Sequence, residues 1–301
     1  MLFRSLQGSV AGLTGTDFAA VWGGFFAQSL VLDNAGFALQ GVEAGPRDFL
    51  ATRVARVTEG DSLAGIILRR GISVPNGGTL PVFDFSSAEA FQPEAHQLSL
   101  GGLDVAGAVV STRLITSSLD VPMSLRFSQH GGTTLSYPAI PESRLLAGDL
   151  QVVTGQTHVA GSLILESDYF RAPLDRTLDM GGPIVAPQIS TVATTPTLRV
   201  RARFGPQSEY DRETSITYQQ GQTVVVVAMT SAYATLLGAY DLEIPELSTV
   251  ANFNPAWALH GTTELQWSAQ RDGGTLGVGT DVVPFEGAVH RSASTIGVFA
   301  P

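Results

Sequence analysis

The feature that most constrains the fold is a two-residue alternation of apolar and polar side chains. It is strict in TLRVRARF (197–204), where four apolar residues alternate with arginines, and it recurs in TELQW (263–267). The run QTVVVVAMT (222–230) is continuously apolar, which is typical of a strand covered on both faces. Apolar periodicity of the helical kind is confined to two short segments, 86–90 and 231–238. The pattern predicts an all-β chain with little helix.

Glycine pairs punctuate these apolar segments. Three of them read alike, NGGTL (76–80), HGGTT (130–134) and DGGTL (272–276), with one in each third of the chain. Glycine tolerates positive φ, so such pairs suit tight hairpins between strands. Short strands with frequent turns predict two or three consecutive β-sandwich modules.

Two polar, proline-bearing segments mark the predicted module boundaries, namely 86–97 and 179–197. They divide the chain into modules at 6–92, 94–188 and 190–301. The second boundary is alternatively a long loop inside one larger unit, 94–301. We expect the later modules to be similar to immunoglobulin or fibronectin sandwiches.

The first module carries the most informative stretch, NAGFALQGVEAGPRDFLATR (34–53). A Gly-aromatic pair (36–37) opens a strand, GVEAG (41–45) turns, and DFLA (48–51) returns. This pattern resembles the transthyretin-like, carboxypeptidase-regulatory-like family of small β-sandwiches over about residues 6–90. The resemblance implies a sandwich fold, and a structural, spacer or accessory role for the module.

Composition excludes several classes of function. The chain has 17 arginines, no lysine and a net charge of −10, which argues against a general nucleic-acid binder and against an anionic membrane surface. It contains no cysteine, so disulfides and thiolate metal sites are excluded. No apolar run reaches 18 residues, and no transmembrane helix is therefore predicted.

The first five residues, MLFRS, have an unusual origin in our interpretation. They read back as ATG CTC TTC CGA TCT, which matches the end of a widely used sequencing adapter. We interpret residues 1–5 as a non-native artefact that makes few contacts, with the true start and any signal peptide lost. The absence of lysine, with abundant Ala, Gly, Val and Arg, indicates a GC-rich bacterial genome.

The tetrapeptide GDSL at 60–63 is the motif that names a family of serine esterases. In that family the serine follows a buried parallel strand and opens a helix, and a distant DxxH supplies the other catalytic residues. Here AGIILRRGISV (64–74) follows Ser62 and reads as a strand, and no DxxH occurs. We therefore expect Gly60 and Asp61 to form a polar turn, and we assign no catalytic residue.

Two groups of side chains are candidates for ligand binding. Arg199, Arg201 and Arg203 project from one strand face and could hold a carboxylate, a sulfate or an acidic polysaccharide. We favour surface ion pairs there, with the acidic residues at 209, 211 and 213 as partners. Trp257 and Trp267 could stack on sugar rings, but strand parity favours core positions for both.

Metal sites are not supported by the spacing of potential ligands. No two of the five histidines lie within five residues of each other, which excludes HxH and HExxH pairs. Asp168, Asp175 and Asp179 lack the spacing of calcium loops, so we expect a solvated loop. No metal and no cofactor is predicted.

These observations together predict a non-catalytic protein that is secreted, periplasmic or attached to the cell surface. We expect a structural, spacer or binding role, with polysaccharide or envelope proteins as candidate partners. The alternative is an accessory carbohydrate-binding protein, or the non-catalytic part of a truncated extracellular hydrolase. We also expect the strand at 222–230 to be internal, because a bare edge of this composition would aggregate.

Overall fold

The computed structural model describes residues 3–24, 27–57, 60–101, 107–124, 127–128, 134–237, 239–261, 263–277, 279 and 282–301. The prediction of an all-β chain with little helix is confirmed. In the described ranges there is one α-helix, α1 (Ser231–Leu237), and two 3-10 turns, η1 (Glu142–Arg144) and η2 (Pro255–Trp257). The other predicted helix, at 86–90, is wrong, because that segment forms turns.

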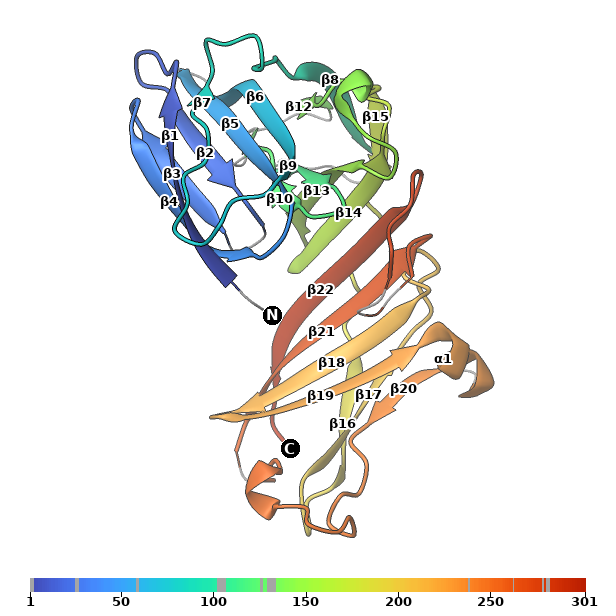
Figure 1. Cartoon of the computed structure of the whole chain (residues 1–301). Coiled ribbons are helices and arrows are strands. Elements are labelled where there is room, and N and C mark those ends of the chain that lie inside the picture. Colours follow the sequence, from blue (N-terminus) through green and yellow to red (C-terminus); the bar gives the residue numbers. More distant parts are fainter. Residues whose placement is uncertain are drawn as a thin grey trace.

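The first seven strands form a β-sandwich, drawn in blue to teal in Figure 1. One sheet has the order β4-β1-β7 and the other β3-β2-β5-β6. The strands are β1 (Phe3–Ala11), β2 (Phe18–Trp22), β3 (Gln28–Leu32), β4 (Gly36–Glu43), β5 (Arg47–Val57), β6 (Gly60–Ile72) and β7 (Phe83–Asp84). Both sheets bury alternate apolar residues in a shared core that includes Leu6, Leu39, Phe49 and Ile67.

A close approach between β1 and β4 depends on a glycine. Gly8 is the register partner of Phe37, and a Cβ at Gly8 would lie 2.4 Å from the Phe37 ring. The missing side chain lets the ring lie over β1 and enter the core. The Gly36–Phe37 pair of the sequence pattern thus begins β4, although β4 runs on to Glu43 before the chain turns.

Residues 3–5 make more contacts than we expected. Phe3 and Arg4 lie in β1 and pair with Glu43 and Val42 of β4. Ser5 accepts a backbone hydrogen bond from Gly77 at 2.8 Å. The expectation of few contacts is wrong for these residues, since backbone pairing extends a strand whatever the side chains are. Residues 1 and 2 lie outside the described ranges.

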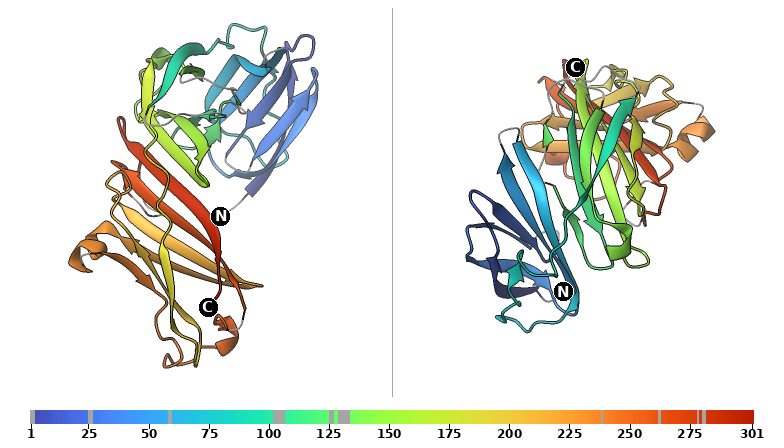
Figure 2. Two further views of the ribbon diagram at one scale, coloured as in Figure 1. Left: turned by 180° about the vertical axis from the view of Figure 1, so that it is seen from behind. Right: turned by 90° about the horizontal axis from the view of Figure 1, so that it is seen from above.

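The remaining strands belong to two further sandwiches that share one sheet. That sheet has the order β10-β9-β13-β14-β22-β21-β18-β19, with β11 paired to β9 as its ninth strand. The three-stranded sheet β12-β8-β15 covers one half of it, and the sheet β16-β17-β20 covers the other half. Figure 2 shows the long shared sheet from two further directions.

The strands of the second sandwich are β8 (Glu94–Gly101), β9 (Val109–Ile115), β10 (Asp120–Pro122), β11 (Phe127–Ser128), β12 (Thr134–Ala139), β13 (Leu150–Val159), β14 (Ser162–Phe170) and β15 (Arg176–Asp179). Those of the third are β16 (Gln188–Ala193), β17 (Arg199–Phe204), β18 (Glu213–Gln220), β19 (Thr223–Thr230), β20 (Tyr240–Glu243), β21 (Leu265–Gly274) and β22 (Val289–Phe299).

The ladder between β14 and β22 joins the second and third sandwiches. It runs from Ser162↔Thr295 to Asp168↔Val289, so backbone hydrogen bonds cross the boundary predicted near residue 189. One continuous core cluster also extends through both halves, from Leu98 to Ala293. The two halves of residues 94–301 therefore share one sheet and one continuous core.

The first sandwich packs against the second through the outer face of its sheet β3-β2-β5-β6. Ala20, Trp22 and Leu50 form a buried cluster with residues of the second sandwich such as Leu114 and Val121. A polar network flanks this cluster, because Arg70 of β6 bonds Asp48 at 2.9 Å and Asp149, which precedes β13, at 2.6 Å. The second and third sandwiches are thus joined by a shared sheet, and the first is joined to the second by a packed apolar cluster.

Two of the predicted glycine hairpins differ from expectation. Gly77 has φ +72 in a turn between β6 and β7, but these two strands are not paired with each other. Gly273 and Gly274 lie at the end of β21 and do not form a hairpin turn. Gly273 is required there by packing, since a Cβ would lie 2.1 Å from the Glu209 carbonyl oxygen. The third pair, at 131–132, lies outside the described residues.

Candidate functional site

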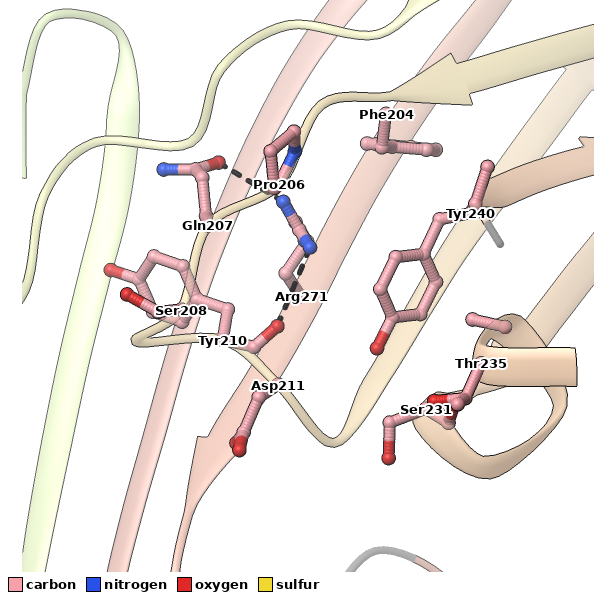
Figure 3. A pocket seen from close by; sticks show the side chains of 12 residues that line it. Phe204, Pro206, Gln207, Ser208, Tyr210, Asp211, Ser231, Thr235, Tyr240 and Arg271 are labelled. Atoms are coloured by element: carbon pink, nitrogen blue, oxygen red, sulfur yellow. Dashed lines mark hydrogen bonds between the residues drawn. The ribbon is translucent and has the colours of Figure 1, made fainter. Parts of the chain in front are cut away.

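A cavity of about 750 Å³ lies at one end of the third sandwich. Figure 3 shows that its wall on one side is the loop between β17 and β18, and on the other side α1 and Tyr240 of β20. Arg271 of β21 lies between these walls. The cavity therefore opens where the two sheets of the sandwich separate.

The loop from 205 to 212 is held in place by close backbone packing. Gly273 lets the loop backbone at Glu209 lie directly on β21. Tyr210 is fully buried, and its hydroxyl donates to the Gly182 carbonyl at 2.7 Å. Burial raises the pKa of Tyr210 far above its usual value, so this hydroxyl stays protonated and remains a donor. The result is a fixed cavity wall.

Arg271 is the unusual residue of the site. It is 1% exposed, yet all four hydrogen bonds of its guanidinium go to neutral acceptors. These acceptors are the carbonyls of Gly205 and Tyr210 and the side chains of Gln207 and Thr214. The fifth N–H, on Nη2, has no hydrogen-bond partner among the described residues. Burial lowers the pKa of Arg271, which reflects a positive charge held out of water without a bonded carboxylate.

The rest of the cavity combines an aromatic surface with small polar groups. The Tyr240 ring lies 5.1 Å from the Arg271 guanidinium carbon. Hydroxyls of Ser208, Ser231 and Thr235 line the cavity, together with the Asp211 carboxylate. An apolar cleft with a few convergent polar groups is the usual form of a small-molecule site. This set can donate hydrogen bonds to a ligand carboxylate or hydroxyl and can cover a ring face.

The arginine stripe predicted from sequence is ion-paired. Arg199 and Arg201 both bond Glu243, and the Nε of Arg203 lies 3.1 Å from Asp241. Surface ion pairs were expected, but the partners at 209, 211 and 213 were wrong. The acidic partners come from β20, because β20 is the register neighbour of β17. The three arginines of the stripe thus share two carboxylates within their own sheet.

The two tryptophans lie in different environments. Trp267 is half-buried over β22, since a Cβ at Gly297 would lie 2.4 Å from its ring. Trp257 is 64% exposed and meets Phe253 edge-on, with ring centroids 6.4 Å apart. The core prediction for Trp257 is wrong because residues 255–257 form the turn η2, in which strand parity does not apply.

A second, polar cavity of about 470 Å³ lies on the outer face of the shared sheet. There His290 Nε2 lies 3.1 Å from Asp272 Oδ1, and Gln270 donates to the same carboxylate. In the described ranges no serine or threonine hydroxyl is hydrogen-bonded to His290.

Among the described residues, the other acidic and histidine side chains do not assemble a metal site. Asp168 accepts a hydrogen bond from Arg176, and Asp175 accepts one from the backbone N–H of Gln97 at 2.9 Å. Asp179 lies near Arg291, with 3.7 Å between Oδ2 and Nη2. Within the part of the chain that the structure describes, no group of three His, Asp or Glu side chains could hold a metal ion.

Ser62 lies on β6, the edge strand of its sheet, and is exposed. Its register partner is Ala55, and the chain continues as a strand to Ile72 without opening a helix. Gly60 and Asp61 already belong to β6, so the turn expected at these two residues is wrong. Residues 58 and 59, which connect β5 to β6, lie outside the described ranges.

Sequence reasoning missed Arg271, although one signal for it existed. In LQWSAQR (265–271), strand parity places Arg271 on the same face as Leu265 and Ala269, both of which are buried. A charged residue at a core-facing position is an informative exception. Tyr240 and Gln207 carry no comparable signal, because only the fold brings them to Arg271.

A scan against protein-family models finds no match, and a search of curated protein sequences finds none either. No helix in the described ranges has the length and hydropathy needed to cross a membrane.

Proposed function

We propose that this chain is a non-catalytic β-sandwich protein of the cell exterior, which acts as a rigid support for a binding surface. The observation that carries the proposal is the ladder between β14 and β22, which fuses two sandwiches under one sheet. The buried cluster around Trp22 and Leu50 supports rigidity at the other junction. A rigid multi-module body is what a spacer or scaffold requires.

We further propose that the first sandwich is a transthyretin-like module. Its seven strands in two sheets and the strand start at Gly36 support this relationship. Such modules serve as spacers and accessory domains, which fits the support role. A secreted, periplasmic or surface location belongs to the same proposal, and the complete gene with its upstream sequence tests it.

Rigidity can be tested directly because the chain has no cysteine. Cysteines introduced at Ala38 and Ser268, both exposed, would carry spin labels on the first and third sandwiches. We expect a single narrow distance distribution, as wide as that of a control pair at Ala38 and Gln28 within one sandwich. The labelled chain is diluted with unlabelled protein, so that only distances within one chain are measured. A broad or bimodal distribution for the first pair alone would then show that the modules move independently.

The non-catalytic part of the proposal has its own test at Ser62. A fluorophosphonate probe should leave Ser62 unlabelled, because no hydrogen-bonded base activates its hydroxyl among the described residues. Labelling that is lost in Ser62→Ala would overturn this assignment and restore the esterase interpretation.

A second candidate function is carbohydrate binding, and the cavity at Arg271 favours it. We propose that a hydroxylated ring bearing a carboxylate, as in an acidic polysaccharide, would cover the Tyr240 ring. Its carboxylate would accept the spare N–H of Arg271, which offsets the buried positive charge. The exposed Asp211 at the same cavity would repel this ligand slightly.

This candidate predicts opposite effects for two substitutions in the cavity. In calorimetric titrations with uronate oligosaccharides, Tyr240→Ala should weaken binding by about tenfold, or about 1.4 kcal/mol. Asp211→Asn should strengthen it a few-fold by removing a like charge, and should not affect neutral oligosaccharides. Trp257→Ala is the matched control. If Trp257→Ala alone abolishes binding, the sugar site is the Phe253–Trp257 pair instead.

A further inference from the structure

Strand β19 forms one end of the shared nine-stranded sheet, and Figure 1 shows it beside β18, its neighbour in that sheet. Its backbone ladder is formed with β18 alone, from Gln220↔Thr223 to Glu213↔Thr230. Among the described residues, no other backbone hydrogen bond reaches residues 223–230. Eight residues of strand therefore present one unpaired edge.

This edge lacks the features that protect sheet edges from pairing with other chains. Natural edges carry charges, prolines or β-bulges, or are very short. Every other described edge strand longer than five residues has such a feature. Examples are the arginines 69 and 70 in β6, Pro138 in β12, the register shift in β16 and Glu43 in β4. The sequence of β19, TVVVVAMT, contains none.

The hairpin geometry shows which residues offer the free backbone groups. Gly221 and Gln222 form a two-residue turn, so the flanking pair Gln220↔Thr223 exchanges both hydrogen bonds. Alternation along the ladder then turns the N–H and C=O groups of Val224, Val226 and Ala228 toward the free edge. Val224 and Val226 are also 55% and 62% exposed. Val224 and Val226 thus present both unpaired backbone groups and exposed apolar side chains to a partner.

We propose that β19 pairs with β19 of a second copy of this chain in an antiparallel, two-fold arrangement centred on Val226. In that register Val226 faces its own symmetry mate, Val224 faces Ala228, and Val225 faces Val227. Each of these pairs is aliphatic and keeps both residues on the same sheet face. The two nine-stranded sheets become one continuous sheet across the two-fold axis.

Charge is the reason for assigning a second copy as the occupant. A two-fold axis places identical residues opposite each other, so any charged residue near the centre of the edge would oppose its own copy. The chain carries a net charge of −10, yet β19 has no charged residue along its length. An acidic edge such as β20, with Asp241 and Glu243, could not pair with itself in this way.

Sedimentation equilibrium of the full chain tests the proposal, with Val226→Lys as the disrupting variant and Ile296→Lys as the control. Ile296 is 78% exposed on the same outer sheet face, but it lies on β22. Wild type and Ile296→Lys should be dimers, whereas Val226→Lys, with two like charges at the axis, should be a monomer. A monomeric wild type at all accessible concentrations overturns the proposal.

Hydrogen exchange distinguishes edge pairing from association through the sheet face. The amides of Val224, Val226 and Ala228 should be protected in the wild-type dimer and should exchange rapidly in Val226→Lys. The amides of Val225 and Val227 bond to β18 and should stay protected in both proteins. A dimer whose Val226 amide exchanges rapidly, or a loss of dimer in Ile296→Lys, would show that the edge is not the contact.

Discussion

Strands β2 and β19 are both continuous apolar runs, but the first is buried on both faces and the second on one. All five residues of FAAVW (18–22) are buried. In β19 the valines alternate, with Val225 and Val227 packed against the core and Val224 and Val226 exposed. The prediction that 222–230 is internal is therefore wrong. An apolar run indicates a strand, but a neighbouring module decides whether its second face is covered.

The cover on β2 comes from residues far away in the sequence. Ala20 and Trp22 turn away from the core of their own sandwich and meet Leu114, Val121 and Met123 of the second sandwich. Nothing comparable lies over β19 among the described residues. The outward face of β2 is thus a module junction, and the edge of β19 is open for intermolecular contact.

The largest loss of stability is expected for a substitution on the covered outer face of β2. Ala20→Asp would bury an unpaired carboxylate in the junction cluster and should lower the free energy of unfolding by about 4 kcal/mol. Leu30→Asp is the matched control, because Leu30 is the register partner of Ala20 and is 58% exposed. Chemical denaturation measures both. Equal, small effects would mean that the first sandwich is not docked on the second.

A somewhat smaller effect is expected for the polar part of the same junction. Arg70→Met leaves Asp48 and Asp149 buried without their cation and should cost about 3 kcal/mol at neutral pH. Burial opposes ionisation of Asp48, but hydrogen bonds from the Gly71 amide, Thr116 and Arg70 outweigh it and hold its pKa below 3.8.

The pH dependence of this variant follows from the sign of that shift. A lowered folded-state pKa gives a stabilisation that is present above the unfolded value of 3.8 and is lost as the pH falls through the folded value. The difference between wild type and Arg70→Met should therefore be largest at neutral pH and should shrink in acid, because a protonated Asp48 no longer needs the cation. A difference that grows in acid would contradict the role given to Asp48.

Sequence alone predicts those parts of this fold that are determined by residues close together in the chain. Strand parity places Leu198, Val200 and Ala202 inside, and all three are buried. Parity also fails where the chain leaves the strand, as at Trp257. The site could not be assembled, because Arg271, Tyr240 and Gln207 come together only when two sheets pack. No local pattern encodes that juxtaposition.

A small gain in stability is expected from a substitution on the core-facing side of the β18–β19 hairpin. Tyr218 is the register partner of Val225, and its fully buried hydroxyl has no hydrogen-bond partner among the described residues. Tyr218→Phe removes that desolvated group at little cost in volume and should raise the free energy of unfolding by up to about 1 kcal/mol. A loss of more than that in thermal or chemical unfolding would reveal a partner for the hydroxyl.

The smallest effect is expected on the open face of β19 itself. Val226→Asp should change the free energy of unfolding by less than about 0.5 kcal/mol, because Val226 is 62% exposed and an exposed carboxylate stays hydrated. Val227→Asp is the companion variant and should be clearly destabilising, since Val227 packs against the core of the third sandwich. Both should be measured at protein concentrations too low for two copies to associate, where stability reflects a single chain. Equal losses for the two variants would mean that the second face of β19 is covered like that of β2. The contrast between the two strands would then disappear, and with it the free edge on which pairing of two copies depends.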